Sequence, residues 1–430
     1  MFATVKQIFS PKNKDLQKRI AFTFFVLFIF MLGTTVVVPV IDKENLLGNI
    51  KGFDLFNIIG GGALEKFSIF ALGVSPYITA SIIIQLLQMD IVPYLSDLKD
   101  QGQVGRDKIN KITRVTGIIL AFVQGYLFAI YQIKGLSAIQ YMEIATIFTA
   151  GTAAVLWMGD QITQKGIGNG ISLIIMAGIV ASMPNMFSIA WTNLIKIGGT
   201  SGSAMGILSF IAYILVYIFV IVGIIYTQLA ERRIPIQYAN KSVSTYQSNN
   251  SYLPFKLNSA GVMPVIFASG LISLPSMMAS LMGSKYVGFQ TFVNKWLSTS
   301  SYTGFILYMI FIIIFAYFYT FKVAIKTDEM AKNLNRNGGF IPGIRPGKET
   351  EEYVSKVLKR VTFVGALTLC VIAGLPVIFG VITKLPSAVS LGGTGMLIVV
   401  GVALETYKQV ESEIISKNYQ KGRRRWKVLF

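Results

Sequence analysis

Apolar runs of about 20 residues recur along the chain and restrict its fold more than any other feature. A bilayer core about 30 Å thick is crossed by a helix of roughly 20 apolar residues. Hydrophobic residues make up 53% of the sequence and charged residues only 14%, unlike a soluble domain. We therefore expect an all-α membrane protein. Its ten candidate spans are Ile20–Ile41, Ser68–Met89, Val115–Ile133, Ile144–Met158, Ile171–Met186, Ala204–Leu229, Leu257–Met282, Tyr302–Val323, Val361–Ile382 and Leu391–Ala403.

Three of these runs, the fourth, fifth and tenth, are short, and we expect their helices to extend into polar flanks. The first run is too long for the apolar part of a cleavable signal peptide and lacks a small-residue cleavage site close behind it. It is interpreted as a retained span.

Basic residues indicate the orientation of the spans. With the N-terminus in the cytoplasm, 31 of the 39 Lys and Arg residues fall in cytoplasmic segments. Such a bias is typical of the cytoplasmic side of membrane proteins. The pattern predicts a multi-pass protein with both termini in the cytoplasm.

The spans divide into two sets of five. Because five is odd, two sequential halves must insert in opposite orientations, which makes an inverted repeat plausible. We expect an N-terminal half at residues 1–200 and a C-terminal half at residues 201–430, with long cytoplasmic loops at about 230–257 and 323–360. In the second loop a glycine-rich and proline-rich turn surrounds Arg345, and a helix is predicted to begin near Thr350.

Several kinds of chemistry lack their residues in this sequence. Histidine is absent, which removes the usual catalytic triad and the zinc motifs built on imidazole. The single cysteine, Cys370, excludes an internal disulfide. The spans hold almost no charge near mid-membrane, although ion-coupled transport usually requires it. We expect no catalytic residue, no metal and no cofactor.

Some patterns leave alternatives open. Uncharged polar residues in the spans, such as Thr79, Gln124 and Asn258, are equally consistent with ordinary hydrogen bonds between helices. The glycine-spaced "QKGIGNGIS" suits any tight helix reversal. The basic run Arg423–Arg425 suits acidic lipid better than ribosomal RNA. The stretch "IIGGGALEKF", Ile58–Phe67, is too short and too glycine-rich to span.

Four long motifs occur in order along the chain: "GGALEKFSIFALGVSPYITASIIIQLL", "GDQITQKGIGNGISLIIMAGIVA", "LPFKLNSAGVMPVIFASGL" and "NGGFIPGIRPGKETEEYVSKVL". Together they resemble the SecY/Sec61-alpha family, whose members form the channel of the Sec protein translocase. The resemblance covers nearly the whole chain, from the first span to the "GGTGMLIVV" of the last.

The resemblance implies a central pore between the two halves, closed by a short plug helix. This plug segment corresponds to Leu55–Phe67. Non-spanning backbone at membrane depth is tolerated only where protein or a water-filled cavity surrounds it. The residues assigned to the plug are Ile58, Ile59, Gly60, Gly61, Gly62, Ala63 and Leu64.

The resemblance also places an apolar pore ring, a narrow collar that resists ions by dewetting yet yields around a polypeptide. It consists of Val74, Ile78, Ile171, Ile175, Ile266 and Ile398. Valine at position 74, where isoleucine is common in the family, is expected to loosen the collar slightly.

A lateral gate toward lipid is implied between spans two and three and spans seven and eight, with Thr79, Gln124 and Asn258 forming a polar cluster across it. Arg232, Arg233 and Arg345 match basic residues of the loops that the family uses for SecA and the ribosome. The first loop, "YANKSVSTYQSNNSY", holds less positive charge than is usual, so its contact with ribosomal RNA is less firmly implied.

The expected function is a passive protein-conducting channel. It would secrete unfolded, signal-bearing precursors across the bacterial cytoplasmic membrane and insert membrane proteins laterally. SecA or the ribosome would drive it, and SecE and SecG would complete a heterotrimer. Signal peptides, translocating polypeptides and membrane lipids are further expected partners, with SecDF and YidC. The alternative function is a secondary transporter with inverted repeats.

Overall fold

Helix dominates the computed structural model of the chain, which describes residues 13–39, 54–88, 91–133, 135–196, 204–238, 251–281, 287–298, 301–321, 325, 327–383 and 387–428. The chain divides into two compact units. The first comprises Met1–Thr192, Ser276–Gln290 and Ser387–Phe430, and the second comprises Asn193–Pro275 and Thr291–Pro386. The expected boundary near residue 200 falls outside the described residues, and the division into sequential halves stays a prediction.

Ten helices of the described chain correspond to the ten predicted spans. Seven of the described helices are long and apolar enough to cross a membrane. The helices at spans four, five and ten extend beyond the apolar runs, as predicted. The ten are α2 (Lys14–Gly33), α4 (Ser75–Leu87), α6 (Gly102–Gln132), α7 (Ala138–Lys165), α8 (Gly170–Lys196), α9 (Ala204–Leu229), α10 (Met263–Leu281), α12 (Tyr302–Tyr319), α14 (Lys348–Thr383) and α15 (Ser387–Val428).

Three span predictions were wrong in their bounds. The seventh helix begins at Met263 rather than at Leu257, because the chain before it forms turns. The first helix ends at Gly33 rather than near Ile41. The second begins only at Ser75, because the chain from Ser68 to Val74 forms turns rather than helix. Gly73 within these turns has φ +51°, a left-handed conformation that glycine adopts at little cost. The second span is therefore a helix of 13 residues preceded by an apolar turn.

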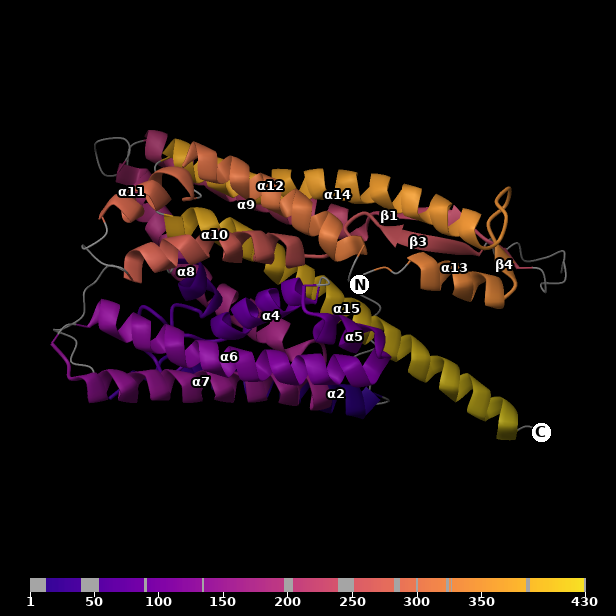
Figure 1. Cartoon of the computed structure of the whole chain (residues 1–430), viewed down its shortest axis with the longest axis horizontal. Coiled ribbons are helices and arrows are strands. Elements are labelled where there is room, and N and C mark those ends of the chain that lie inside the picture. Colours follow the sequence, from indigo (N-terminus) through magenta and orange to yellow (C-terminus); the bar gives the residue numbers. More distant parts are fainter. Residues whose placement is uncertain are drawn as a thin grey trace. The chain divides into compact units, whose positions relative to one another are not determined.

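Glycines allow close packing of the helices in the first unit. α6 and α7 run side by side, and α4 packs on α6 (Figure 1). A Cβ added at Gly117 on α6 would lie 3.3 Å from the Cα of Tyr77 on α4. A Cβ at Gly151 on α7 would lie 2.0 Å from the carbonyl oxygen of Ile69. Small residues at such points let backbones approach within the membrane.

The first turn of α2, the turn before α8 and the interior of α15 meet around a small apolar cluster in the same unit. Leu16, Ile167, Val410 and Ile414 are buried together there. Arg19 on α2 pairs with Glu413 on α15 at 3.4 Å. The amide of Ile167 donates to Thr23 Oγ1 at 3.1 Å, which joins the turn before α8 to α2.

In the second unit, α14 packs against α12 and α9, and α12 and α14 lie side by side in Figure 1. A Cβ at Gly374 on α14 would lie 2.8 Å from Cε of Met309 on α12. The thiol of Cys370 faces the carbonyl oxygen of Met309 at 3.6 Å. This thiol therefore lies within a helix contact.

The two long loops of the second unit contain strands, and the second also contains a short helix, none of which was predicted from the sequence. β1 (Glu231–Pro235) pairs antiparallel with β3 (Tyr252–Lys256), and β2 (Gln237–Tyr238) pairs with β4 (Gly339–Phe340). The two loops therefore join through a shared sheet. A buried cluster joins residues of β1 and β3 to the second loop and α14, and consists of Ile234, Phe255, Ile341, Val354 and Leu358.

Short helices complete the fold. They are α3 (Asp54–Ile59), α5 (Pro93–Asp100), α11 (Val287–Trp296) and α13 (Thr327–Arg336). The helix predicted to begin near Thr350 begins at Lys348 and continues into the membrane span as α14, as expected. Its polar first turns thus extend directly from the span.

Candidate functional site

The plug segment is a short helix followed by a turn. α3 has six residues and ends at Ile59. Gly61 and Gly62 then adopt φ values of +72° and +77°. Such angles break a right-handed helix and favour glycine. The expected plug helix over Leu55–Phe67 is therefore helical only in its first part.

Asn57 closes this turn on itself. Its side-chain Nδ2 donates to Glu65 Oε2 at 3.4 Å, and its Oδ1 accepts from the Glu65 amide at 3.2 Å. Its carbonyl oxygen accepts from the Gly62 amide at 2.8 Å. These bonds make the segment from Asn57 to Glu65 a self-contained loop.

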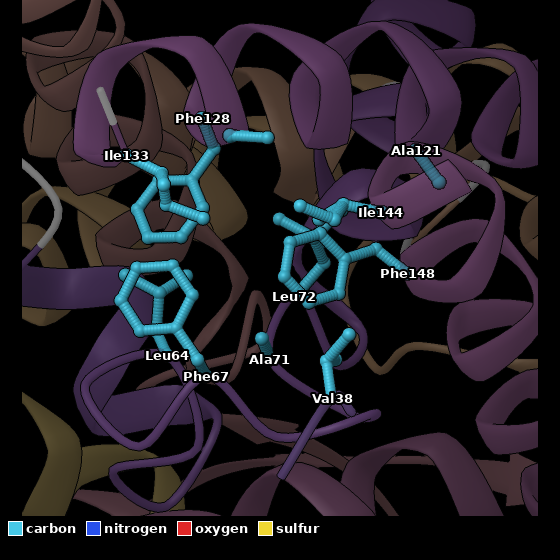
Figure 2. Close-up of a cluster of buried hydrophobic side chains, with 11 residues drawn as sticks. Val38, Leu64, Phe67, Ala71, Leu72, Ala121, Phe128, Ile133, Ile144 and Phe148 are labelled. Carbon is cyan, nitrogen blue, oxygen red and sulfur yellow. The ribbon is translucent and has the colours of Figure 1, made fainter. Parts of the chain in front are cut away.

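The C-terminal end of the plug segment is fixed in an apolar cluster. Leu64 and Phe67 are buried among side chains of α6 and α7, and Figure 2 shows the rings of Phe67 and Phe128 facing each other. The carbonyl oxygen of Phe67 accepts from the Val38 amide at 3.0 Å. Phe67 also has φ +47°, which is rare outside glycine and marks backbone strain.

The other end of the plug segment packs on small residues. Gly61 lies against Gly178 and Ala181 on α8, and Gly60 lies near Gly73 before α4. α3 also packs against α15. The plug segment therefore touches three of the elements that carry pore-ring residues, all within the first unit.

Five of the six pore-ring residues belong to this unit. Val74 caps α4 and Ile78 follows one turn later. Val74, Ile175 and Ile398 are buried, whereas Ile78 and Ile171 are half-buried. Ile171 Cγ1 would lie 3.0 Å from a Cβ at Gly159, so its side chain also packs on α7. The sixth member, Ile266 on α10, is half-buried in the second unit.

Two contacts set the register of α8 against α15. Ile179 Cγ2 would lie 3.0 Å from a Cβ at Gly395, and Thr406 Oγ1 would lie 3.1 Å from a Cβ at Gly168. Residue numbers rise from 168 to 179 along α8 while their partners fall from 406 to 395 along α15, so the two helices are antiparallel. Ile175 and Ile398 each lie about one turn inside the Ile179–Gly395 contact. They therefore sit at the same level.

The three predicted gate residues are buried. Thr79 Oγ1 donates to the Ser75 carbonyl at 3.1 Å in its own helix. Gln124 lies on α6, which packs against α4. In the second unit, Asn258 Nδ2 donates to the Gly261 carbonyl at 2.8 Å and closes the turn before α10.

The two arginines of β1 occupy different environments. Arg233 Nε donates to Glu231 at 2.7 Å, and its guanidinium lies 4.6 Å from the centre of the Tyr252 ring. The hydrogen bond to Glu231 raises the pKa of Arg233. Arg232 pairs with Phe255 in the strand register and, because side chains alternate along a strand, points to the opposite face.

Arg345 stands at the tip of the second loop. Its side chain is 87% exposed and lies 3.9 Å from Glu349. The Arg345 carbonyl accepts from Thr350 Oγ1 at 2.8 Å, and Gly343 and Gly347 on either side have positive φ. The backbone thus presents this arginine to solvent from a fixed turn.

Two residues of the site were not identified from the sequence. Gly178 stands within "AGIVA", where small residues at helical spacing were the available signal. Phe67 was named only as the end of the plug segment. Its positive φ could not be predicted, because an aromatic residue gives no sequence signal for a left-handed backbone. Both contacts depend on chain segments distant in sequence.

The comparisons with known proteins agree over nearly the whole chain. The SecY family model matches residues 68–407. The protein translocase subunit SecY of Halalkalibacterium halodurans is 42% identical over 435 residues, covering 98% of this chain and 99% of that protein. The subunit of the same name from Staphylococcus epidermidis is 43% identical over 432 residues, with the same coverage of both chains, 98% and 99%.

Solved structures show the same fold. A protein-conducting channel aligns with a TM-score of 0.69 at 22% identity, covering 93% of each chain. A structure described as showing that the SecY plug domain stabilises the closed state and maintains a membrane seal gives a TM-score of 0.67 at 21% identity, again over 93% of each chain. Sec61 from the canine ribosome–channel complex gives 0.67 at 20% identity over 93% of each chain. The chain belongs to the SecY family.

Proposed function

We propose that the chain is the central pore-forming subunit of a Sec translocon, a passive channel for unfolded, signal-bearing precursors and for membrane proteins that leave it sideways into lipid. The observation that carries this proposal is the plug segment packed against three elements of the first unit that carry pore-ring residues. Curated relatives at 42% and 43% identity are named protein translocase subunits, which supports the same reading.

The pore ring would form the barrier. Its six members are Val74, Ile78, Ile171, Ile175, Ile266 and Ile398, all branched and apolar. A narrow collar of such side chains dewets and stops ions, but it binds no particular peptide sequence. The common level of Ile175 and Ile398 on neighbouring helices supports a ring rather than scattered packing residues.

The plug segment would close the ring from one side when the channel is idle. Gly60, Gly61 and Gly62 give its backbone freedom to bend, whereas Leu64 and Phe67 are held in the cluster of Figure 2. We infer that the glycine end moves and the aromatic end stays attached.

The lateral gate would include Thr79 on α4, Gln124 on α6 and Asn258 before α10. Polar groups that pair across such a seam contribute about 1 to 2 kcal/mol each in model peptides, which an inserting apolar helix can overcome. A signal peptide that competes for pairing of this kind would open the seam.

The proposed partners are SecE and SecG as companion subunits, SecA and the ribosome as sources of energy, and membrane lipids, with SecDF and YidC as further partners. Arg232, Arg233 and Arg345 are proposed to bind SecA or the ribosome, because an arginine fork suits both carboxylate and phosphate. The ribosome is supported by the fold shared with canine Sec61 in a ribosome–channel complex.

The chain is a multi-pass membrane protein, and we place it in the bacterial cytoplasmic membrane with both termini in the cytoplasm. The distribution of its Lys and Arg residues supports that orientation. Membership in a channel family argues against an enzyme, and a secondary transporter is not favoured, since the spans supply almost no midplane charge.

Crosslinking tests the pore assignment. A cysteine is placed at Ile78 or Ile266 in a Cys370→Ser background, together with SecE, SecA and ATP. We expect crosslinks to a stalled precursor at both sites, and none from a cysteine at the 64% exposed Phe219 on α9. Labelling by lipid alone at both pore-ring sites would overturn the proposal.

A further inference from the structure

We propose that Gly178 on α8 is the seat of the plug segment, and that the missing side chain at this position sets how firmly the idle channel is shut. The inference rests on the proposed function, because it assigns a positioning residue to the closed state of that channel. The plug seat is defined here as Gly178 together with Ala181 one turn later.

The backbone of the plug segment occupies the space that a side chain at Gly178 would need. A Cβ there would lie 2.1 Å from the carbonyl oxygen of Ile59, 3.1 Å from its carbonyl carbon and 3.2 Å from the amide nitrogen of Gly61. All three are main-chain atoms, so no change of rotamer relieves the overlap. A methyl group at Gly178 requires the plug segment to move.

The contact is equally close from the side of the plug segment. A Cβ at Gly61 would lie 3.2 Å from both the Cα and the carbonyl oxygen of Gly178, and 3.5 Å from the Cβ of Ala181. The plug seat is therefore a contact between two glycine backbones. Gly61 also has φ +72°, so substitution there would mix backbone strain with lost space, whereas Gly178 tests the space alone.

The plug seat lies beside the pore ring. Gly178 is three residues from Ile175 on the same helix, which places the two about one turn apart. The adjacent plug residue lies near a second ring position, since the Cα of Gly60 would lie 3.7 Å from a Cβ at Gly73, the neighbour of Val74. Displacement at Gly178 therefore changes the fit of the plug segment beside two ring positions.

A helix-interior glycine at this point needs an explanation, since alanine is favoured over glycine in helices by roughly 0.5 to 1 kcal/mol. Alanine at position 178 would strengthen α8 itself. A leak caused by Gly178→Ala would consequently report the lost contact with the plug segment rather than a weakened helix.

The test uses the full chain with SecE and SecG in proteoliposomes and measures ion leakage through the idle channel. We expect Gly178→Ala to raise leakage on the order of tenfold, the factor that follows from a shift of about 1.4 kcal/mol in a two-state equilibrium. Gly178→Val should raise it further. Export of a precursor with a defective signal sequence should rise in parallel.

Gly223→Ala on α9 is the matched control. It is the same change in an apolar helix, but the added Cβ would meet Ile372 at 3.6 Å, an ordinary contact. We expect leakage to stay at the level of the unmodified channel. Equal leakage from Gly178→Ala and Gly223→Ala would overturn the inference.

A chain lacking residues 55–62 separates the plug seat from the plug itself. If the deletion leaks, and adding Gly178→Ala to the deletion does not increase that leakage, the inference is supported. Leakage from the deletion combined with a tight Gly178→Ala channel overturns the plug seat and leaves the plug. A tight channel after the deletion overturns the proposed plug function.

Should Gly178→Ala fail to accumulate in the membrane when the plug segment is present, the amount of the variant is measured in the chain that lacks residues 55–62. Recovery there supports a clash with the plug segment, and loss in both backgrounds overturns the inference. Ala181→Leu provides a second variant, which should leak more than the unmodified channel with the plug segment present and add nothing without it.

Discussion

The ring of Phe67 stacks on the ring of Phe128, with centroids 5.3 Å apart and an interplanar angle of 28°. Phe67 ends the plug segment, and Phe128 belongs to α6, so the contact attaches the segment to a long helix of the same unit. The opposite end of the segment rests on glycine. One end is therefore held by an aromatic contact, and the other by close backbone packing beside the buried side chains of Ile58 and Ile59.

Phe67→Ala should weaken this attachment. Replacing a buried phenylalanine with alanine typically costs about 3 to 5 kcal/mol, and the positive φ of residue 67 remains strained in the variant. We expect greater ion leakage from the idle channel and faster proteolysis within the plug segment. Phe67→Leu, which keeps apolar bulk, should leak less than Phe67→Ala, and the reverse order would contradict an anchoring role.

Ile175→Asn and Ile398→Asn should each make the pore ring easier to wet. The two residues sit at one level on antiparallel helices, so a polar group at either position hydrates the same constriction. We expect a rise in idle conductance from each single variant and a double variant that falls short of the sum of the two. Ile175→Leu and Ile398→Leu serve as controls, since they keep the collar apolar.

Full additivity of the two asparagine changes would indicate independent sites and contradict a shared ring. Conductance of reconstituted single channels provides the measurement. Leakage unchanged in both single variants would remove Ile175 and Ile398 from the barrier.

The lengths of the apolar runs predicted most of the spans, because the length of a hydrophobic run is a local property of the sequence. Ala204–Leu229 has the same bounds in the sequence and in the structure, and α14 begins within two residues of the predicted start at Thr350. Helices of this kind need no distant contact to be recognised, since burial in lipid alone favours them.

The conformation of Ser68–Val74 could not be predicted in the same way. This stretch is apolar enough to continue a helix, but Val37 and Ser68 form an isolated bridge and the Ile69 amide donates to the Val36 carbonyl at 2.9 Å. Those partners come from the chain after α2. The plug seat at Gly178 depends likewise on a contact more than a hundred residues away in sequence.

Gly365→Ala should destabilise the second unit. A Cβ at Gly365 on α14 would lie 2.2 Å from the carbonyl oxygen of Leu257, next to Asn258 in the proposed lateral gate. Overpacking of this kind typically costs about 1 to 3 kcal/mol. We expect a lower melting temperature of the purified complex and altered export of precursors with weak signals.

Gly223→Ala again supplies the control, and its melting temperature should match or exceed that of the unmodified chain. If the Gly365→Ala complex has the same melting temperature as the unmodified complex, the turn before α10 adapts freely to the added methyl group. The backbone contact would then have no part in positioning Asn258.

Arg232→Ala should weaken ribosome binding more than Arg233→Ala. Arg233 is bonded to Glu231 and stacked on Tyr252, so part of its charge is already compensated. Arg232 makes no ion pair within the described part of the chain and lies on the other face of the β1–β3 strand pair.

Loss of one phosphate contact lowers the salt dependence of binding by about one unit of slope. Titration of ribosomes against the reconstituted channel at several salt concentrations should show that reduced slope for Arg232→Ala and a smaller change for Arg233→Ala. Glu231→Gln should free the charge of Arg233 and tighten ribosome binding. Equal losses of binding from both arginine variants, with no effect of Glu231→Gln, would contradict the division of roles.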